Sequence, residues 1–171
     1  MIKTAVIILN WNGIRFLKMF LPGVVKNSLA SDTKIYVADN GSTDGSAEWI
    51  NENFSNVTLI RLESNYGFSA GYNLAIQQID AQYYVLLNSD IEVEAGWLEP
   101  LISCLDANPD VASCQPKILS YKQKDHFEYA GAAGGFIDKY GYPLCRGRVI
   151  TEIEKDTGQY DTPADIFWST G

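Results

Sequence analysis

Short apolar runs alternate with helix-like segments through the first two-thirds of the chain, and this alternation constrains the fold more than any other feature. Such runs, rich in Val, Ile, Leu and Tyr, are typical of strands covered on both faces. They occupy residues 5–9, 35–38, 57–62 and 83–87. Because parallel strands are joined by helical crossovers, the pattern predicts an α/β fold with a mainly parallel sheet flanked by helices.

Apolar residues at three- and four-residue spacing predict the helices between these runs. The four stripes span residues 14–24, 47–54, 68–79 and 97–105. Within the first stripe, Pro22 and Gly23 predict a kink or a restart, because proline lacks the N–H that an internal helical turn requires.

The sequence pattern changes near residue 120. From Tyr121 onward the helical spacing fades while glycines and aromatic residues become frequent, which predicts loops and short strands. No repeat, low-complexity tract or linker separates the two parts. We therefore predict a single domain over residues 1–171, with an α/β part at 1–119 and a different part at 120–171.

The charge balance limits the ligands that the chain can bind. It carries 13 Lys and Arg against 21 Asp and Glu, a formal net charge of −8. This argues against nucleic acid as a partner, because nucleic-acid binding uses basic surface. An acidic site can hold a diphosphate only with help from backbone N–H groups, local cations or a bound metal.

The cysteines and the N-terminal segment indicate the cellular compartment in which the protein is expected. Cys104, Cys114 and Cys145 form no C-x-x-C pair, and an odd number of cysteines is typical of reduced cytosolic thiols. The apolar run at residues 5–9 is too short for a signal-peptide core or a membrane span. We expect a cytoplasmic protein, with peripheral association at the inner face of the membrane left open.

Small polar or acidic residues follow every predicted strand. In an open parallel sheet, ligands bind outside the carboxyl ends of the strands. Asp39-Asn40-Gly41 alone resembles an ordinary turn, and Thr43 or Asp44 alone would cap the helix that follows. Four such segments at one sheet edge favour a shared binding site, and they span residues 10–13, 39–46, 63–73 and 88–90.

The residue types at this edge suit a nucleotide diphosphate. The Asp39 carboxylate can accept the imide N3–H of uracil or thymine, and it also suits guanine, whereas cytosine lacks this proton. Gly67 and Gly71 permit close backbone approach near the start of the third helix, whose free N–H groups would face phosphate oxygens. Asp90 with Asn88 offers hard oxygen ligands for Mg²⁺ or Mn²⁺.

Four segments, taken together and in order, resemble the family 2 glycosyltransferases, which have a GT-A fold. They read Val-Ile-Ile-Leu-Asn-Trp-Asn-Gly at 6–13, Val-Ala-Asp-Asn-Gly-Ser-Thr-Asp-Gly at 37–45, Asn-Tyr-Gly-Phe-Ser-Ala-Gly-Tyr-Asn at 65–73 and Leu-Leu-Asn-Ser-Asp at 86–90. The resemblance covers most of residues 3–119 and is highly specific. It is closest to the rhamnosyltransferase-like bacterial members, and residues 131–138 and 141–147 also resemble a signature of that subgroup.

This resemblance implies roles for individual residues. Asp39 would bind the nucleotide base, and Asn10 and Asn12 would line the nucleotide pocket. The residues that would border the base, ribose and phosphates are Asn65, Gly67 and Asn73. Asn88-Ser89-Asp90 stands where the family has its D-x-D motif, so Asp90 would bind the metal, with Asn88 replacing the first Asp.

The catalytic base of the family has no match in the sequence. Family members place a carboxylate, usually in a Glu-Asp pair, well after the D-x-D strand. We therefore expect an N-terminal piece of a longer protein, with the base beyond residue 171 and the chain alone inactive. Local alternatives are His126, Asp138 and Asp165, for which loop or turn roles are the commoner interpretation.

The implied activity is an inverting, metal-dependent sugar transfer. The donor would be a UDP- or dTDP-sugar bound by residues 1–119. The acceptor would be a saccharide or lipid-linked saccharide in surface polysaccharide synthesis, met by residues 120–171. Two alternatives stay open: a non-catalytic nucleotide-sugar-binding module, and a sugar-1-phosphate nucleotidyltransferase, although residues 10–13 lack the Gly-rich basic loop that grips a triphosphate.

Overall fold

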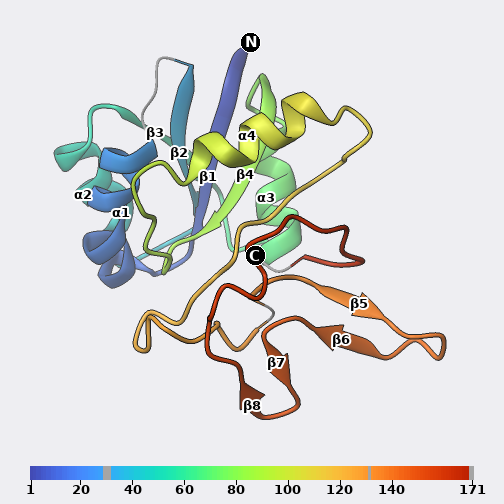
Figure 1. Ribbon diagram of the computed structural model, residues 1–171. Coiled ribbons are helices and arrows are strands. Elements are labelled where there is room, and N and C mark those ends of the chain that lie inside the picture. The colour runs from blue at the N-terminus through green and yellow to red at the C-terminus, as the bar shows by residue number, and fades with distance from the viewer. Residues whose placement is uncertain (29–31, 131, 170–171) are drawn as a thin grey trace. The chain divides into compact units, whose positions relative to one another are not determined.

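The computed structural model describes residues 1–28, 32–130 and 132–169 and divides into two compact units (Figure 1). The first unit is Met1–Glu99 and the second is Pro100–Gly171. Their boundary falls before residue 120, where the sequence pattern changes. Gly131, which belongs to the 131–138 signature, and the C-terminal Thr170 and Gly171 lie outside the described residues.

A four-stranded parallel sheet forms the centre of the first unit, as the apolar runs predict. The strands are β1 (Ile2–Asn10), β2 (Thr33–Asn40), β3 (Val57–Leu62) and β4 (Ala81–Asn88). Their spatial order is β3-β2-β1-β4, and each neighbouring pair is parallel. The chain therefore steps outward from β1 to β3 and then crosses back to β4, which makes the β1–β4 junction a topological switch point.

Helices follow the strands as predicted. They are α1 (Ile14–Ser28), α2 (Ser46–Asn53), α3 (Phe68–Ile76) and α4 (Leu98–Ala107). Since crossovers between parallel strands are right-handed, the reversal of direction after β3 places α3 on the opposite face of the sheet from α1 and α2 (Figure 1).

Helix α1 continues through Pro22 as one helix, so the predicted restart is wrong. Pro22 lies on the exposed side, while Leu21 and Val24 beside it are buried. Packing of this buried stripe maintains the helix across a residue that removes only one backbone donor.

Strand β1 is buried on both faces, which explains its unbroken apolar sequence. Ala5 and Ile7 pack in a cluster with Tyr72 and Ala75 of α3. Val6, whose side chain alternates with these along the strand, is fully buried on the other face. The buried strand therefore fixes the position of Asn10 at its carboxyl end.

Truncation of a buried α1 side chain should cost far more stability than truncation of an exposed one. Leu17 is 1% exposed, whereas Met19 on the same helix is 51% exposed. Leu17→Ala should lower the free energy of unfolding by about 2–5 kcal/mol, and Met19→Ala by less than about 0.5 kcal/mol. Urea unfolding followed by circular dichroism checks this, and equal costs would contradict the burial of the Leu17 side.

The second unit contains short strands and loops, as predicted. Strands β5 (Gly135–Ile137), β6 (Pro143–Cys145), β7 (Arg148–Val149) and β8 (Glu152–Ile153) form an antiparallel sheet in chain order. Phe127 is fully buried in its small core with Ala132 and Ala133. Gly147 has a φ of +93° and lies against this ring: a Cβ there would be 2.8 Å from Cγ of Phe127.

Within the described residues, no helix has both the length and the apolar character needed to span a membrane.

Candidate functional site

The carboxyl ends of β1, β2 and β4 bring three of the predicted site residues to one edge of the sheet. Asn10 is the register partner of Asp39, and Leu9 is the partner of Asn88. The predicted convergence of the strand-end segments therefore occurs in the structure, although the binding roles of these residues stay predictions.

Asp39 is a nearly buried carboxylate, 4% exposed, at the end of β2. Its Oδ1 accepts hydrogen bonds from Asn10 Nδ2 at 3.1 Å and from Ser46 Oγ at 3.5 Å, and its Oδ2 accepts one from the backbone N–H of Ser42 at 3.2 Å. These donors offset the cost of burying the charge. A carboxylate can accept about four hydrogen bonds, so Oδ2 can accept one more.

Asn10 supports Asp39 from within the fold. Its side chain is fully buried, and Nδ2 also lies 3.1 Å from Ser42 Oγ and 2.9 Å from Ser46 Oγ. It therefore holds Asp39 and the two serines from within the fold, and its implied place in the nucleotide pocket stays a prediction.

Gly13 is required by the Asn10 side chain, a feature that sequence reasoning did not identify. A Cβ at Gly13 would be 2.5 Å from Asn10 Oδ1, so any side chain would displace the amide. Asn10 Oδ1 is buried and has no hydrogen-bond partner among the described residues. The Gly13 carbonyl in turn accepts the N–H groups of Phe16 and Leu17 and starts α1.

Asn12 joins the loops that follow β1 and β2. Its Oδ1 accepts the backbone N–H of Thr43 at 2.8 Å, and its own N–H donates to Ser42 Oγ at 2.9 Å. The residue has a φ of +50°, a conformation that Asn tolerates better than most residues. Asn12 thus lies in the same hydrogen-bonded group as Asp39.

Asp44 satisfies the N-termini of two helices with one carboxylate. Oδ2 accepts the N–H of Ile14, the first residue of α1, at 2.8 Å, and Oδ1 accepts the N–H of Ser46, the first residue of α2, at 3.0 Å. Burial alone would raise the pKa of Asp44, but the hydrogen bonds from Ser46 and Ile14 outweigh it and lower the pKa below its usual value. The predicted capping by Asp44 is confirmed, with Gly45 as the N-cap residue itself.

Replacing Asp44 by Asn should make stability less dependent on pH. Asn offers one acceptor oxygen where two N–H groups need one each, so Asp44→Asn should cost about 1–2 kcal/mol at pH 7. Because the folded pKa is depressed, the Asp44 contribution is complete above the unfolded pKa of about 3.9 and is lost as pH falls through the folded value. The stability difference between the two proteins should therefore shrink below about pH 4.

The measurement is urea unfolding at a series of pH values. Glu52→Gln, at an exposed position on α2, controls for the loss of a surface charge. A difference that stays constant from neutral to acid pH would contradict the assignment of this carboxylate to the two helix ends.

Asn40 fixes the loop before α3 and was considered in the sequence only as a turn residue. Its Nδ2 donates to Asn65 Oδ1 at 3.0 Å and to the Gly67 carbonyl at 3.1 Å, and its Oδ1 accepts the Tyr66 N–H at 3.0 Å. The structure thus brings Asn65 and Gly67 beside the end of β2. Gly71 is the point of close approach, because a Cβ there would be 2.9 Å from Leu9 Cδ1.

Asn73 is not joined to this group. It is exposed on α3, and its side chain makes no hydrogen bond to the residues that the structure describes. Its predicted contact with the nucleotide stays a prediction.

Asn88 and Asp90 lie at and just beyond the carboxyl end of β4, and their predicted role in metal binding stays a prediction. Asn88 is half-buried and Asp90 is exposed, and neither side chain has a partner in the described part of the chain. The described residues contain no group of three His, Cys, Asp or Glu that could hold a metal ion. One carboxylate and one amide oxygen fit Mg²⁺ or Mn²⁺ only in the mode in which substrate phosphates complete the coordination.

Two of the three local candidates for a catalytic base, His126 and Asp138, are engaged in structural contacts, whereas Asp165 is exposed and has no hydrogen-bond or ion-pair partner among the described residues. His126 Nδ1 lies 2.7 Å from Asp125 Oδ1. Hydrogen bonds from Lys155 and His126 lower the pKa of Asp125 to about 2. Asp138 Oδ1 accepts the N–H groups of residues 140 and 142 at 2.8 and 2.9 Å, which confirms its expected turn role.

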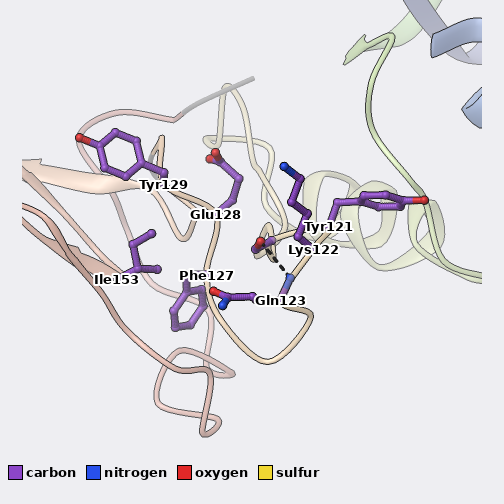
Figure 2. A pocket seen from close by; sticks show the side chains of 8 residues that line it. Tyr121, Lys122, Gln123, Phe127, Glu128, Tyr129 and Ile153 are labelled. Atoms are coloured by element: carbon purple, nitrogen blue, oxygen red, sulfur yellow. Dashed lines mark hydrogen bonds between the residues drawn. The ribbon is translucent and has the colours of Figure 1, made fainter. Parts of the chain in front are cut away.

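A hollow of about 310 Å³ lies in the second unit (Figure 2). Figure 2 shows Tyr121 and Tyr129 at its two ends, with the side chains of Lys122 and Glu128 between them. The Arg148 guanidinium covers the Tyr129 ring at 4.3 Å from its centroid. The lining residues are Ser120, Tyr121, Lys122, Gln123, Phe127, Glu128, Tyr129 and Ile153.

The parallel sheet with polar residues at its carboxyl edge defines an α/β protein with a candidate ligand site at that edge. The chain belongs to glycosyl transferase family 2, because the model of that family matches residues 5–163.

Two curated relatives carry glycosyltransferase names. The chain is 27% identical to N-acetylgalactosaminyltransferase 4 of Drosophila melanogaster over 151 residues, which cover 70% of the chain and 23% of that protein. It is 28% identical to a cholesterol galactosyltransferase of Borreliella burgdorferi over 116 residues, 66% of the chain and 32% of that protein. The chain thus spans less than a third of the length of either relative.

Solved structures show the same fold. The crystal structure of S. aureus TarS 1–349 in complex with UDP-GlcNAc matches with a TM-score of 0.56 and 22% identity, over 63% of this chain and 32% of that one. The complex of the same TarS segment with UDP gives the same TM-score and identity. The fold is therefore that of the GT-A glycosyltransferases, of which this chain covers a part.

Proposed function

We propose that this chain is the donor-binding part of a glycosyltransferase that moves a sugar from a UDP- or dTDP-sugar to an acceptor hydroxyl. The observation that carries the proposal is the buried Asp39 carboxylate, held by Asn10, Ser42 and Ser46 while Oδ2 keeps room for one more donor. The names of the relatives support the reaction class, and the TarS complex with UDP-GlcNAc supports a nucleotide-sugar donor.

Base selection follows from the chemistry of the carboxylate. Asp39 Oδ2 accepts the imide N3–H of uracil or thymine, and guanine also offers an N–H at the corresponding edge. Cytosine presents a lone pair at N3, which a carboxylate repels. The proposed donor specificity therefore depends on a buried carboxylate, which in its ionised form accepts hydrogen bonds and donates none.

Replacing Asp39 by Asn should reduce the discrimination between UDP and CDP. Asn keeps the shape but offers an NH₂ group that can donate to cytosine N3. We expect UDP affinity to fall about 10- to 100-fold, as for the loss of a charge-assisted hydrogen bond, while CDP affinity is unchanged or rises. Thermal-shift titrations with UDP, dTDP, GDP and CDP measure this.

Asp80→Asn is the matched control, because Asp80 is an exposed carboxylate at the amino end of β4. It should respond to nucleotides as the unaltered chain does. An Asp39→Asn protein that still prefers UDP over CDP to the original extent would contradict the base-reading role.

We further propose that Asp90 and Asn88 hold Mg²⁺ or Mn²⁺ together with the donor diphosphate. Such a cation neutralises charge on the leaving diphosphate and offsets the repulsion between the acidic chain and its anionic ligand. The two side chains have no other partner among the described residues, which leaves their oxygens available.

Asp90→Asn should remove most of the metal dependence of UDP binding. UDP affinity with Mn²⁺ should fall about tenfold or more, the size of effect expected for a lost charged contact to a bound ion. Affinity in EDTA should be unchanged. Calorimetric titration of UDP with and without Mn²⁺ measures both, and Glu94→Gln, an exposed carboxylate four residues further on, is the control. Equal metal dependence in both variants would exclude Asp90 as a ligand.

Transfer also needs an acceptor and a base to deprotonate its hydroxyl. We propose that the acceptor is a saccharide or lipid-linked saccharide of surface polysaccharide synthesis. We also propose that transfer inverts the anomeric centre, because the family resemblance implies inversion. The sequence contains no match to the family's Glu-Asp pair, and Asp138 and His126 already have structural partners. We therefore assign the base to a part of the protein outside residues 1–171 and not to the exposed Asp165. Residues 1–171 alone should bind donor without transferring sugar.

A further inference from the structure

Charge is distributed unevenly along this acidic chain. Residues 1–31 contain Lys3, Arg15, Lys18 and Lys26 but no Asp or Glu. All 21 acidic residues and the other nine of the 13 basic residues follow residue 31. Three of the four early cations lie on α1, so this helix is a basic element in a chain of net charge −8.

The cations of α1 lie on the side of the helix that faces away from the sheet. The buried side is formed by Leu17, Phe20, Leu21, Val24 and Ser28. Arg15, Met19, Pro22 and Lys26 follow each other at three- and four-residue steps and are all exposed, with Lys18 beside them. We call Arg15, Phe16, Lys18, Met19 and Lys26 the outer face of α1.

Two large apolar side chains share this face with the cations. Phe16 is 40% exposed and Met19 is 51% exposed. Single exposed apolar residues need no explanation, but here they alternate with Arg15 and Lys18 along one helix. Basic side chains that attract anionic headgroups and apolar side chains that insert beside them are the two contributions by which a helix binds at a membrane surface.

The outer-face cations are not neutralised within the described residues. Arg15, Lys18 and Lys26 form no ion pair there; Arg15 and Lys18 lie about 6 Å from the rings of Phe16 and Trp49. Of the two acidic residues of neighbouring α2, Glu48 pairs with Arg61 at 3.2 Å, and Glu52 is exposed and forms no ion pair among the described residues. The Asp44 carboxylate accepts backbone N–H groups.

We propose that the outer face of α1 docks on an anionic lipid surface. Acidic headgroups attract Arg15, Lys18 and Lys26, while Phe16 and Met19 insert at the boundary between headgroups and acyl chains. The net negative charge of the chain does not prevent this, because the Debye length is about 8 Å at physiological ionic strength and screens more distant acids. A helix of 15 residues presents a face about 22 Å long.

This surface contact goes beyond the donor chemistry and does not rest on it. It would hold the protein beside an acceptor carried on a lipid. If docking on lipid fails, the proposed UDP site is not affected. The two proposals are tested separately, because UDP binding is measured on each variant in the absence of lipid.

The test is cosedimentation of the 171-residue chain with vesicles. The probes are vesicles of phosphatidylcholine alone and of phosphatidylcholine mixed with phosphatidylglycerol. We expect binding to the mixed vesicles only, decreasing as salt is raised. Each cation near an anionic surface contributes about fivefold, so the triple variant Arg15→Gln, Lys18→Gln, Lys26→Gln should lower the partition coefficient on the order of a hundredfold.

A charge-matched triple variant provides the control. Lys34→Gln, Lys122→Gln, Lys139→Gln removes three exposed cations from other parts of the chain and should retain binding within a few fold. A double variant, Phe16→Ser with Met19→Ser, should weaken binding at every salt concentration while leaving the salt dependence unchanged, since it alters insertion and not charge.

Four results would overturn the proposal. They are no binding to the mixed vesicles, equal binding to both kinds of vesicle, unchanged binding of the α1 triple variant, and equal losses in the two triple variants. Each variant is first checked by circular dichroism and by its thermal shift with UDP, so that a loss of fold is not taken for a loss of docking.

Discussion

The end of β2 is the point on which the rest of this structure depends. Asp39 and Asn40 are consecutive residues, so their side chains leave opposite faces of the sheet. Asp39 is held by Asn10 of β1 and by Ser42 and Ser46 at the start of α2, whereas Asn40 holds the loop that leads into α3. Two adjacent polar residues thereby organise both sides of the carboxyl edge, at the cost of burying a charge that only this set of donors can accommodate.

Helix termini at the same edge are not equivalent. Asp44 accepts N–H groups from the first residues of α1 and α2, so a protein carboxylate already occupies both positive helix ends. The N-cap residue of α3, Gly67, makes no side-chain capping bond. An anionic ligand at this edge would therefore meet free N–H groups at α3, beside the residues that Asn40 positions. The outer face of α1 has a different composition, basic and apolar instead of polar and acidic.

Much of the fold could be predicted from the sequence because burial imposes a pattern on it. A strand covered on both faces must be apolar throughout, so β1 could be predicted from its unbroken apolar run. Parallel strands end at a common edge, so the proximity of Asn10, Asp39 and Asn88 could also be predicted. The inward orientation of Asn10 could not be predicted, since an amide at a strand end can support a neighbour or face a ligand. The link from Asn40 to residues 65–67 depends on tertiary contacts, as does the continuation of α1 through Pro22. The outer face of α1 could be identified only from the structure, which shows which side of the helix packs against the sheet.

We propose above all that the carboxyl edge of β1, β2 and β4 is a nucleotide-diphosphate site. Paramagnetic broadening of backbone amide signals by Mn²⁺, measured on the ¹⁵N-labelled chain with and without UDP, tests this most directly. With UDP present, broadening should centre on Asp90 and extend to Asn10 and Asp39. It should be much weaker at Lys3, which lies seven residues before Asn10 on β1, about 23 Å away at 3.3 Å per residue. Broadening that is independent of UDP, or that is centred on the amino ends of the strands, would contradict the account.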